Sequence, residues 1–180
     1  MARSFTRKLL GSHSQYSEDI IIDALLAGKP SGFYVDIGAN HPNSLNNTKH
    51  FYDKGWNGVN IEPNPSLYDL LVTHRPKDIN LNIGIGPSGK RNFYVLDADT
   101  FSTFDEKIVE LRAQHGYRLN KTIEISTKPL RMILQEYANE RIIDFCSIDV
   151  EGYELEVIKS NDWERYRPTL LLVEINSNTE

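Results

Sequence analysis

The chain has 180 residues, 39% of them hydrophobic, and its 20 basic and 25 acidic side chains give a net charge of −5. This length is enough for one sizeable core and too short for two ordinary enzyme domains, so we expect a single domain over 1–180, with 1–16 as an N-terminal extension. No run of Lys or Arg forms a stripe that would neutralise a phosphate backbone, which argues against a nucleic-acid partner. No apolar run is long enough to span a membrane, and the basic N-terminus lacks the apolar core of a signal peptide.

The chain has one cysteine, Cys146, which lies in an apolar run typical of a strand. A single cysteine forms neither a disulfide framework nor a cysteine metal site, and this suits a reducing compartment. We therefore expect a cytoplasmic protein.

In the first half of the chain, predicted helices alternate with predicted strands. Acidic residues open the first helix and Gly28 closes it, while Asn64 is a natural N-cap with Pro65 at the first helical position. The predicted elements are a helix over 17–27, a strand over 33–37, a helix over 45–54, a strand over 58–61 and a helix beginning after Asn64.

The second half continues this alternation after a less regular middle. Strands alternating with helices are what a parallel sheet requires, so we predict an α/β fold with an open, doubly wound, mostly parallel sheet. The predicted elements are strands over 79–85 and 92–96 joined by a turn over 86–89, a partly helical insertion over 101–119, a strand over 123–126, a helix containing Leu130, Ile133, Leu134 and Tyr137, a strand over 142–148, a helix over 155–159 and a strand over 169–175.

Several acidic residues lie at or near the ends of predicted strands, where ligands of such sheets gather. A glycine turn follows Asp36, and the missing side chain of Gly38 lets the backbone turn sharply beneath a ligand. Glu62 closes the next strand, where its carboxylate can accept hydrogen bonds from both hydroxyls of a ribose. Asp149 and Glu174 take similar positions later in the chain. This pattern predicts a nucleotide pocket.

The glycine turn departs from the G-x-G-x-x-G pattern of dinucleotide-binding proteins. It continues as Asn40-His41-Pro42-Asn43 and provides no close-packed phosphate cradle. S-adenosylmethionine (SAM) fits better, because it carries a ribose, an adenine and an amino-acid tail but no phosphate. The predicted cofactor-binding residues are Asp36, Gly38, Ala39, Asn40 and Glu62.

Three ordered blocks, over 33–40, 55–65 and 143–154, resemble the FkbM-type SAM-dependent methyltransferases, and the resemblance covers roughly Ser14 to Glu174. It implies a Rossmann-like class I methyltransferase sheet, SAM as methyl donor and usually O-methylation, often of sugars or polyketide-type products. Family members usually continue past the strand at 169–175 with a helix and a terminal strand pair, which this chain lacks, so a truncated or minimal version is expected.

Methylation of a hydroxyl needs a group that takes its proton. Asp149 is the best local source, with Glu151 close by, and His41 follows the glycine turn. In the alternative interpretation, Asp149 binds the methionine end of SAM or caps the next helix, Glu151 points to water, and His41 makes local hydrogen bonds. In a further alternative, Asp149 and Glu151 lie on one rim and hold a divalent cation through their carboxylate oxygens.

Further side chains near the site have two interpretations each. Ser102 and Thr103 fall where the family tends to keep a small hydroxyl pair near the acceptor, or they cap the following helix. Tyr34 and Trp56 belong to the core or to the pocket wall.

The sequence therefore predicts an O-methyltransferase that acts on a carbohydrate or a related small molecule, or on a glycan. Glycan-biosynthesis enzymes are possible partners. One rival is a non-catalytic SAM-binding or structural module. Another is a nicotinamide-dependent oxidoreductase, which would need a third glycine in the first turn.

Overall fold

A computed structural model describes residues 11–175 of the chain. Its central sheet has five strands in the order β3-β2-β1-β7-β8, and every pairing in it is parallel. The strands are β1 (Phe33–Ile37), β2 (Asn57–Ile61), β3 (Ile79–Leu81), β7 (Phe145–Ile148) and β8 (Leu170–Val173). The direction of the strand order reverses between β1 and β7, which is the position where open α/β sheets bind ligands.

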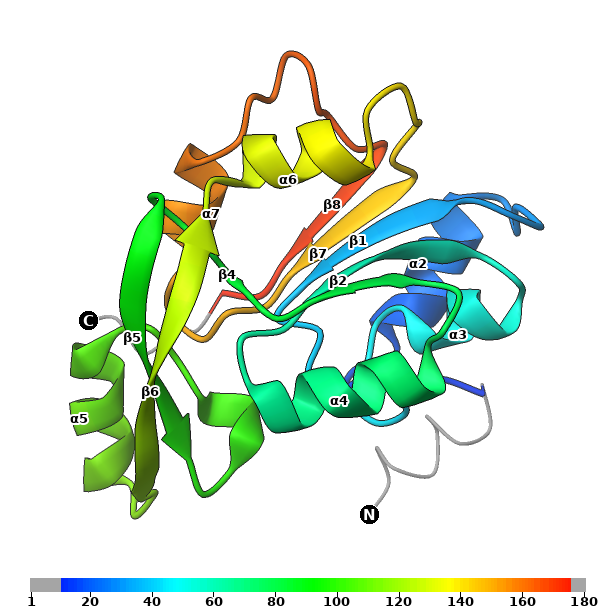
Figure 1. Cartoon of the computed structure of the whole chain (residues 1–180). Coiled ribbons are helices and arrows are strands. Elements are labelled where there is room, and N and C mark those ends of the chain that lie inside the picture. The colour runs from blue at the N-terminus through cyan, green and yellow to red at the C-terminus, as the bar shows by residue number, and fades with distance from the viewer. Residues whose placement is uncertain (1–10, 176–180) are drawn as a thin grey trace.

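Helices cover both faces of this sheet (Figure 1). On one side lie α2 (Glu18–Leu25), α3 (Lys49–Asp53) and α4 (Pro65–His74), and on the other lie α6 (Leu130–Tyr137) and α7 (Glu154–Lys159). The structure thus confirms the predicted α/β fold with a doubly wound parallel sheet. It also confirms Asn64 as the N-cap of α4, because its side chain accepts a hydrogen bond from the backbone N–H of Ser66.

Alternate residues of β1 face two separate cores, because successive side chains of a strand point to opposite faces. Val35 and Ile37 pack with the apolar side chains of α6 on one face. Tyr34, on the other face, packs with Phe51 and Trp56. All five residues of β1 are buried. Of the two interpretations of Tyr34 and Trp56, core or pocket wall, the structure confirms the core.

A second, three-stranded sheet lies beside the central one, beyond the ends of its strands (Figure 1). Its strands, in the order β4-β6-β5, are β4 (Gly84–Ile85), β5 (Gly89–Leu96) and β6 (Leu119–Lys128), and it carries the short 3-10 helix η1 (Asp99–Phe101) and α5 (Glu106–Gln114). The single strand predicted over 79–85 is wrong: β3 and β4 belong to different sheets. The strands predicted over 92–96 and 123–126 are the paired β5 and β6, which are longer than expected.

Two predicted elements begin later than the sequence suggested. The helix expected over 45–54 starts at Lys49, because the side-chain oxygen of Asn46 accepts hydrogen bonds from the backbone N–H groups of Thr48 and Lys49. The strand expected over 142–148 starts at Phe145. Before it, Ile142 is 74% exposed, so its apolar side chain does not join the core.

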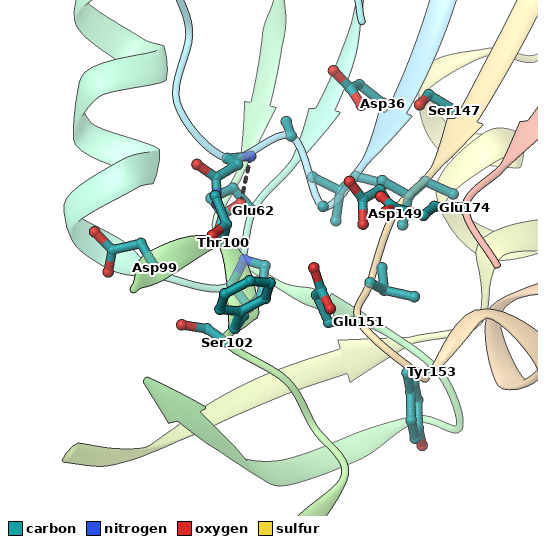
Figure 2. A pocket seen from close by; sticks show the side chains of 18 of the residues that line it. Asp36, Glu62, Asp99, Thr100, Ser102, Ser147, Asp149, Glu151, Tyr153 and Glu174 are labelled. Carbon is teal, nitrogen blue, oxygen red and sulfur yellow. Dashed lines mark hydrogen bonds between the residues drawn. The ribbon is translucent and has the colours of Figure 1, made fainter. Parts of the chain in front are cut away.

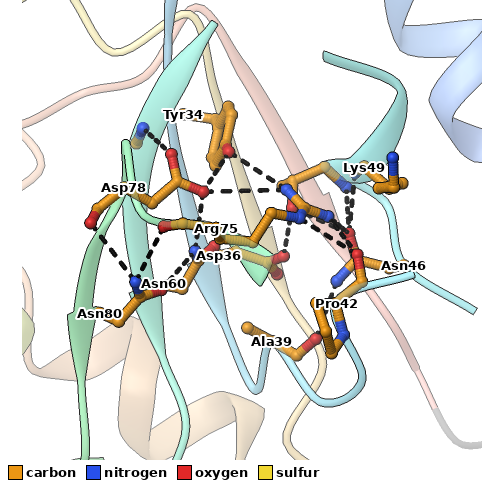
Figure 3. Close-up of polar contacts among 12 residues, drawn as sticks. Tyr34, Asp36, Ala39, Pro42, Asn46, Lys49, Asn60, Arg75, Asp78 and Asn80 are labelled. Carbon is orange, nitrogen blue, oxygen red and sulfur yellow. Dashed lines mark hydrogen bonds and ion pairs between the residues drawn. The ribbon is translucent and has the colours of Figure 1, made fainter. Parts of the chain in front are cut away.

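A buried polar network joins the chain just after α4 to the loop after β1 (Figure 3). The guanidinium of Arg75, fully buried, donates to the carbonyl oxygen of Pro42 at 2.6 Å and to the side-chain oxygen of Asn46 at 3.0 Å. It also lies 3.8 Å from Asp78, whose carboxylate accepts a hydrogen bond from the hydroxyl of Tyr34 at 2.6 Å. Arg75, which is paired with Asp78, therefore holds the loop that follows β1 through hydrogen bonds to Pro42 and Asn46.

Within residues 11–175, no helix is long and apolar enough to cross a membrane.

Candidate active site

A cavity of about 480 Å³ opens beyond the carboxyl ends of the central strands. The central sheet contributes the ends of β1, β2, β7 and β8, while the second sheet contributes β4, η1 and a side chain of α5. The cavity thus lies at the predicted edge of the sheet, next to the position where the strand order reverses. Its acidic lining residues are Asp36, Glu62, Asp99, Asp149, Glu151 and Glu174.

Gly38 makes the turn after β1 with a φ of +82°, a conformation that favours glycine. A Cβ atom added there would lie 1.8 Å from the backbone oxygen of Asp149. Only glycine fits at position 38, because the backbone after β7 lies where a side chain would be. Sequence reasoning placed a ligand above this turn, and it did not anticipate the backbone that lies against it.

Glu62 is buried at the end of β2 and lines the cavity. One carboxylate oxygen accepts a hydrogen bond from the backbone N–H of Asn40 at 2.7 Å, which Figure 2 marks, and the other accepts one from the backbone N–H of Asn64 at 2.8 Å. Burial raises the pKa of Glu62 to about 7, against the opposing effect of these two bonds. Each oxygen keeps a second lone pair for a further donor.

Asp36 also lines the cavity, and its side chain is held by the hydroxyl of Thr48 at 2.8 Å. Burial raises the pKa of Asp36 to about 6. Nearby, the buried hydroxyl of Ser147 accepts a hydrogen bond from the side chain of Asn47 at 3.1 Å. The loop after β1 and the strand β7 are joined by this contact.

Asp149 and Glu174 directly follow the neighbouring strands β7 and β8, and their side chains lie near each other in the cavity (Figure 2). The pairing of Ile148 with Val173 and a hydrogen bond from the backbone N–H of Glu174 to the oxygen of Ile148, at 3.0 Å, hold the two chain segments together. Burial, followed by the hydrogen bond and the charge of Glu174, raises the pKa of Asp149 well above its ordinary value.

Glu151 lines the same cavity but is engaged by a cation. The guanidinium of Arg112, from α5, donates to its carboxylate at 2.8 Å and stacks over the ring of Phe101 at 4.1 Å. The backbone oxygen of Glu151 accepts a hydrogen bond from the hydroxyl of Thr103 at 2.8 Å. Glu151 therefore joins the second sheet to the chain after β7.

The two small hydroxyl residues of the sequence analysis have different positions. Ser102 lines the cavity, and its hydroxyl oxygen accepts a hydrogen bond from the backbone N–H of Leu96 at 3.2 Å. Thr103 is fully buried and does not line the cavity. The N-cap of α5 is Asp105, whose side chain accepts from the backbone N–H of Lys107.

The remaining predicted residues lie in the loop after β1. Ala39 and Asn40 line the cavity, and Asn40 has a φ of +50°. His41 is not among the residues that line it. The backbone N–H of His41 donates to the side chain of Asn40, and its ring nitrogen Nδ1 accepts from the backbone N–H of Asn43 at 3.2 Å. The structure thus brings Asp149 and Glu151 together with the cofactor candidates and leaves His41 apart.

Sequence reasoning missed several lining residues. The sequence did not indicate Arg112 as a lining residue, because its helix has no regular apolar stripe. That segment was predicted only as a partly helical insertion. Gln15 and Tyr16 also line the cavity, although the sequence placed them in an N-terminal extension. The first ten residues of that expected extension lie outside the described part of the chain.

The described residues include no group of three or more His, Cys, Asp or Glu side chains arranged to hold a metal ion.

The parallel sheet, its strand order and the cavity at its carboxyl edge define a Rossmann-like α/β protein with the fold of methyltransferases. The family model described as the methyltransferase FkbM domain matches residues 36–180, so the chain belongs to the FkbM methyltransferase family. No curated protein and no solved structure matches the chain significantly.

Proposed function

We propose that this protein is a SAM-dependent O-methyltransferase that modifies a hydroxyl group of a carbohydrate or related small molecule. The observation that carries the proposal is Glu62, a buried carboxylate at the end of β2 that faces a cavity beside the switch point of a methyltransferase fold. A carboxylate at that position is suited to the two hydroxyls of a ribose.

The backbone around Glu62 supports a role in binding the donor. Two backbone N–H groups fix its carboxylate, so its orientation is set before a ligand enters. The same bonds tie the glycine turn to the start of α4, which places Gly38, Ala39 and Asn40 along the same wall of the cavity. We assign these residues, with Asp36, to the donor.

SAM supplies an activated methyl group, so the protein's main task is to align the acceptor with it. The second sheet offers a polar wall for this purpose, with Asp99, Thr100 and Ser102 along the cavity. Asp149 is our candidate for the group that takes the hydroxyl proton. We assign no chemical step to His41 or to Glu151, since one lies outside the cavity lining and the other is paired with Arg112.

Calorimetric titration with S-adenosylhomocysteine tests the donor site. The wild-type chain should bind it, and Glu62→Gln should bind about tenfold more weakly or worse, because a carboxamide offers only one acceptor oxygen. Glu124→Gln, on an exposed part of β6, is the matched control and should bind like the wild type. NAD should not bind.

A folded wild-type protein that does not bind S-adenosylhomocysteine would contradict the proposal. Circular dichroism of all three proteins establishes the fold before titration. Binding that is unaffected by Glu62→Gln would contradict the assignment of the ribose to Glu62.

A further inference from the structure

We infer that the base of the reaction is a pair of carboxyl groups, those of Asp149 and Glu174. The pair shares one proton before the hydroxyl group of the substrate arrives. Nothing in the family assignment gives a role to Glu174. The inference deepens the proposed function and rests on it, because it concerns the hydroxyl-activating step of that reaction.

The geometry brings these two carboxyl groups together. β7 and β8 are neighbouring parallel strands in register, with Ile148 opposite Val173, so the residues that follow them leave the sheet side by side. Both side chains line the cavity, where they lie near each other (Figure 2). The backbone N–H of Glu174 donates to the oxygen of Ile148, so Asp149 and Glu174 occupy neighbouring positions just past the paired strand ends, and the carboxyl group of Glu174 is close enough to raise the pKa of Asp149.

The other acids of the cavity already have partners that hold them as structural groups. Glu62 accepts two backbone N–H groups, and Asp36 accepts the hydroxyl of Thr48. Glu151 is neutralised by Arg112, and Asp99 accepts a hydrogen bond from the side chain of Asn64 at 3.3 Å. These engagements leave the pair as the acidic group best placed to exchange a proton with a ligand.

The surroundings of the pair favour a shared proton over two negative charges. The charged groups that act on Asp149 are Glu174, Glu151 and Asp36, all of them acidic. Among the described residues, no Lys, Arg or His forms an ion pair with Asp149 or Glu174. Neighbouring carboxyl groups in a partly buried, acidic site resist ionising together, so we assign the resting pair one negative charge.

The transfer then balances without a further reactant. The acceptor oxygen forms a bond to the methyl carbon as the carbon–sulfur bond breaks, and the bonding electrons return to the sulfur, which becomes a neutral thioether. The hydroxyl proton passes to the ionised oxygen of the pair, which becomes neutral. That proton leaves to water after the products depart.

Infrared difference spectroscopy tests the shared proton without an acceptor. At neutral pH, the wild-type spectrum minus that of Asp149→Asn should show the carbonyl stretch of a protonated carboxylic acid, and so should wild type minus Glu174→Gln. Glu124→Gln serves as the control for a Glu to Gln change on the surface and should show no such band. The band should shift in heavy water.

Absence of that band from both difference spectra would overturn the inference. Both substitutions keep side-chain size and the capacity to hydrogen-bond, and the second variant guards against a folding defect in the first. Calorimetric binding of S-adenosylhomocysteine separates the two proposals: if the protein binds it and the band is absent, the pair is wrong while the donor site stands. Failure to bind with the band present would instead refute the proposed function.

Methyl transfer to neutral monosaccharides supplies the kinetic test, measured with radiolabelled SAM on an accepted sugar. Loss of the base typically costs 10²-fold or more, so we expect Asp149→Asn to lower kcat by at least about 100-fold. In Glu174→Gln, the negative neighbour is gone and the pKa of Asp149 falls, so the acid limb of the pH–rate profile should move to lower pH. A slower enzyme with an unmoved acid limb would show that Glu174 has only a structural role.

Discussion

At the residue scale, the carboxylates of the cavity show what a sequence can and cannot predict. Asp36, Glu62 and Asp149 could be found because each follows an apolar run that ends at the same edge of a parallel sheet. Their partners could not be found, because these bonds join positions far apart in the chain. Nothing local in the sequence indicates that the backbone N–H of Asn40 reaches Glu62, or that Arg112 reaches Glu151.

Glu62 should make the stability of the protein depend on pH. Its folded-state pKa of about 7 lies above the ordinary value of 4.5, so the folded state binds the proton more tightly than the unfolded state. That contribution to stability is fully present below pH 4.5 and is lost as the pH rises through 7. Relative to Glu62→Gln, the wild type should therefore gain about 2 to 3 kcal/mol in free energy of unfolding from pH 8 to pH 5.

Urea unfolding of both proteins at the two pH values measures this change. The Gln variant serves as the reference because it has no carboxyl group at this position, so the contributions of all other titrating groups cancel. A difference between wild type and variant that stays constant from pH 5 to pH 8 would refute the raised pKa.

At the scale of the elements, local signals were reliable where a helix or strand begins or ends through its own residues. Asn64 and Pro65 begin α4 as predicted. The run over 79–85 was misread because its apolar residues continue while the backbone passes from one sheet to another between Leu81 and Gly84. Periodicity reports burial, and it does not report which sheet buries a residue.

The loop after β1 depends on Arg75, which lies just past the end of α4. Arg75→Met keeps an unbranched, flexible side chain but removes the donors to Pro42 and leaves the buried carboxylate of Asp78 without its cation. Removing one partner of a buried ion pair typically costs about 3–5 kcal/mol, and we expect a loss of that size in free energy of unfolding. Binding of S-adenosylhomocysteine should weaken as well, since the loop forms one wall of the cavity.

Chemical denaturation of Arg75→Met and of Arg91→Met provides the measurement. Arg91 is exposed on β5, so its replacement should change stability little. Equal effects of the two substitutions would mean that the buried network does not hold the loop.

At the scale of the whole molecule, the second sheet was the largest feature that the sequence did not reveal. Its strands could be read individually, yet their pairing across α5 joins residues that are remote in the chain. This sheet adds η1, Phe104 and Arg112 to the cavity, and so it contributes a large part of the cavity wall. The site is therefore shared between the two sheets.

The hydroxyl of Thr103 makes one of the hydrogen bonds that connect the second sheet to the chain after β7. Thr103→Val keeps the branched shape but leaves the backbone oxygen of Glu151 without this donor, and it removes the acceptor of the backbone N–H of Asp105. The expected loss is about 1–3 kcal/mol in free energy of unfolding, from thermal or urea denaturation. Thr122→Val, at an exposed position of β6, is the control and should leave the free energy of unfolding nearly unchanged. If the Thr103→Val protein is as stable as the Thr122→Val protein, this role of Thr103 is contradicted.

The most direct test of the central claim is a crystal structure of this chain with S-adenosylhomocysteine. The account predicts the ligand in the cavity between the two sheets, its ribose hydroxyls within hydrogen-bonding distance of Glu62 and its sulfur on the side of Asp149. A ligand bound elsewhere, or a ribose without contact to Glu62, would contradict it.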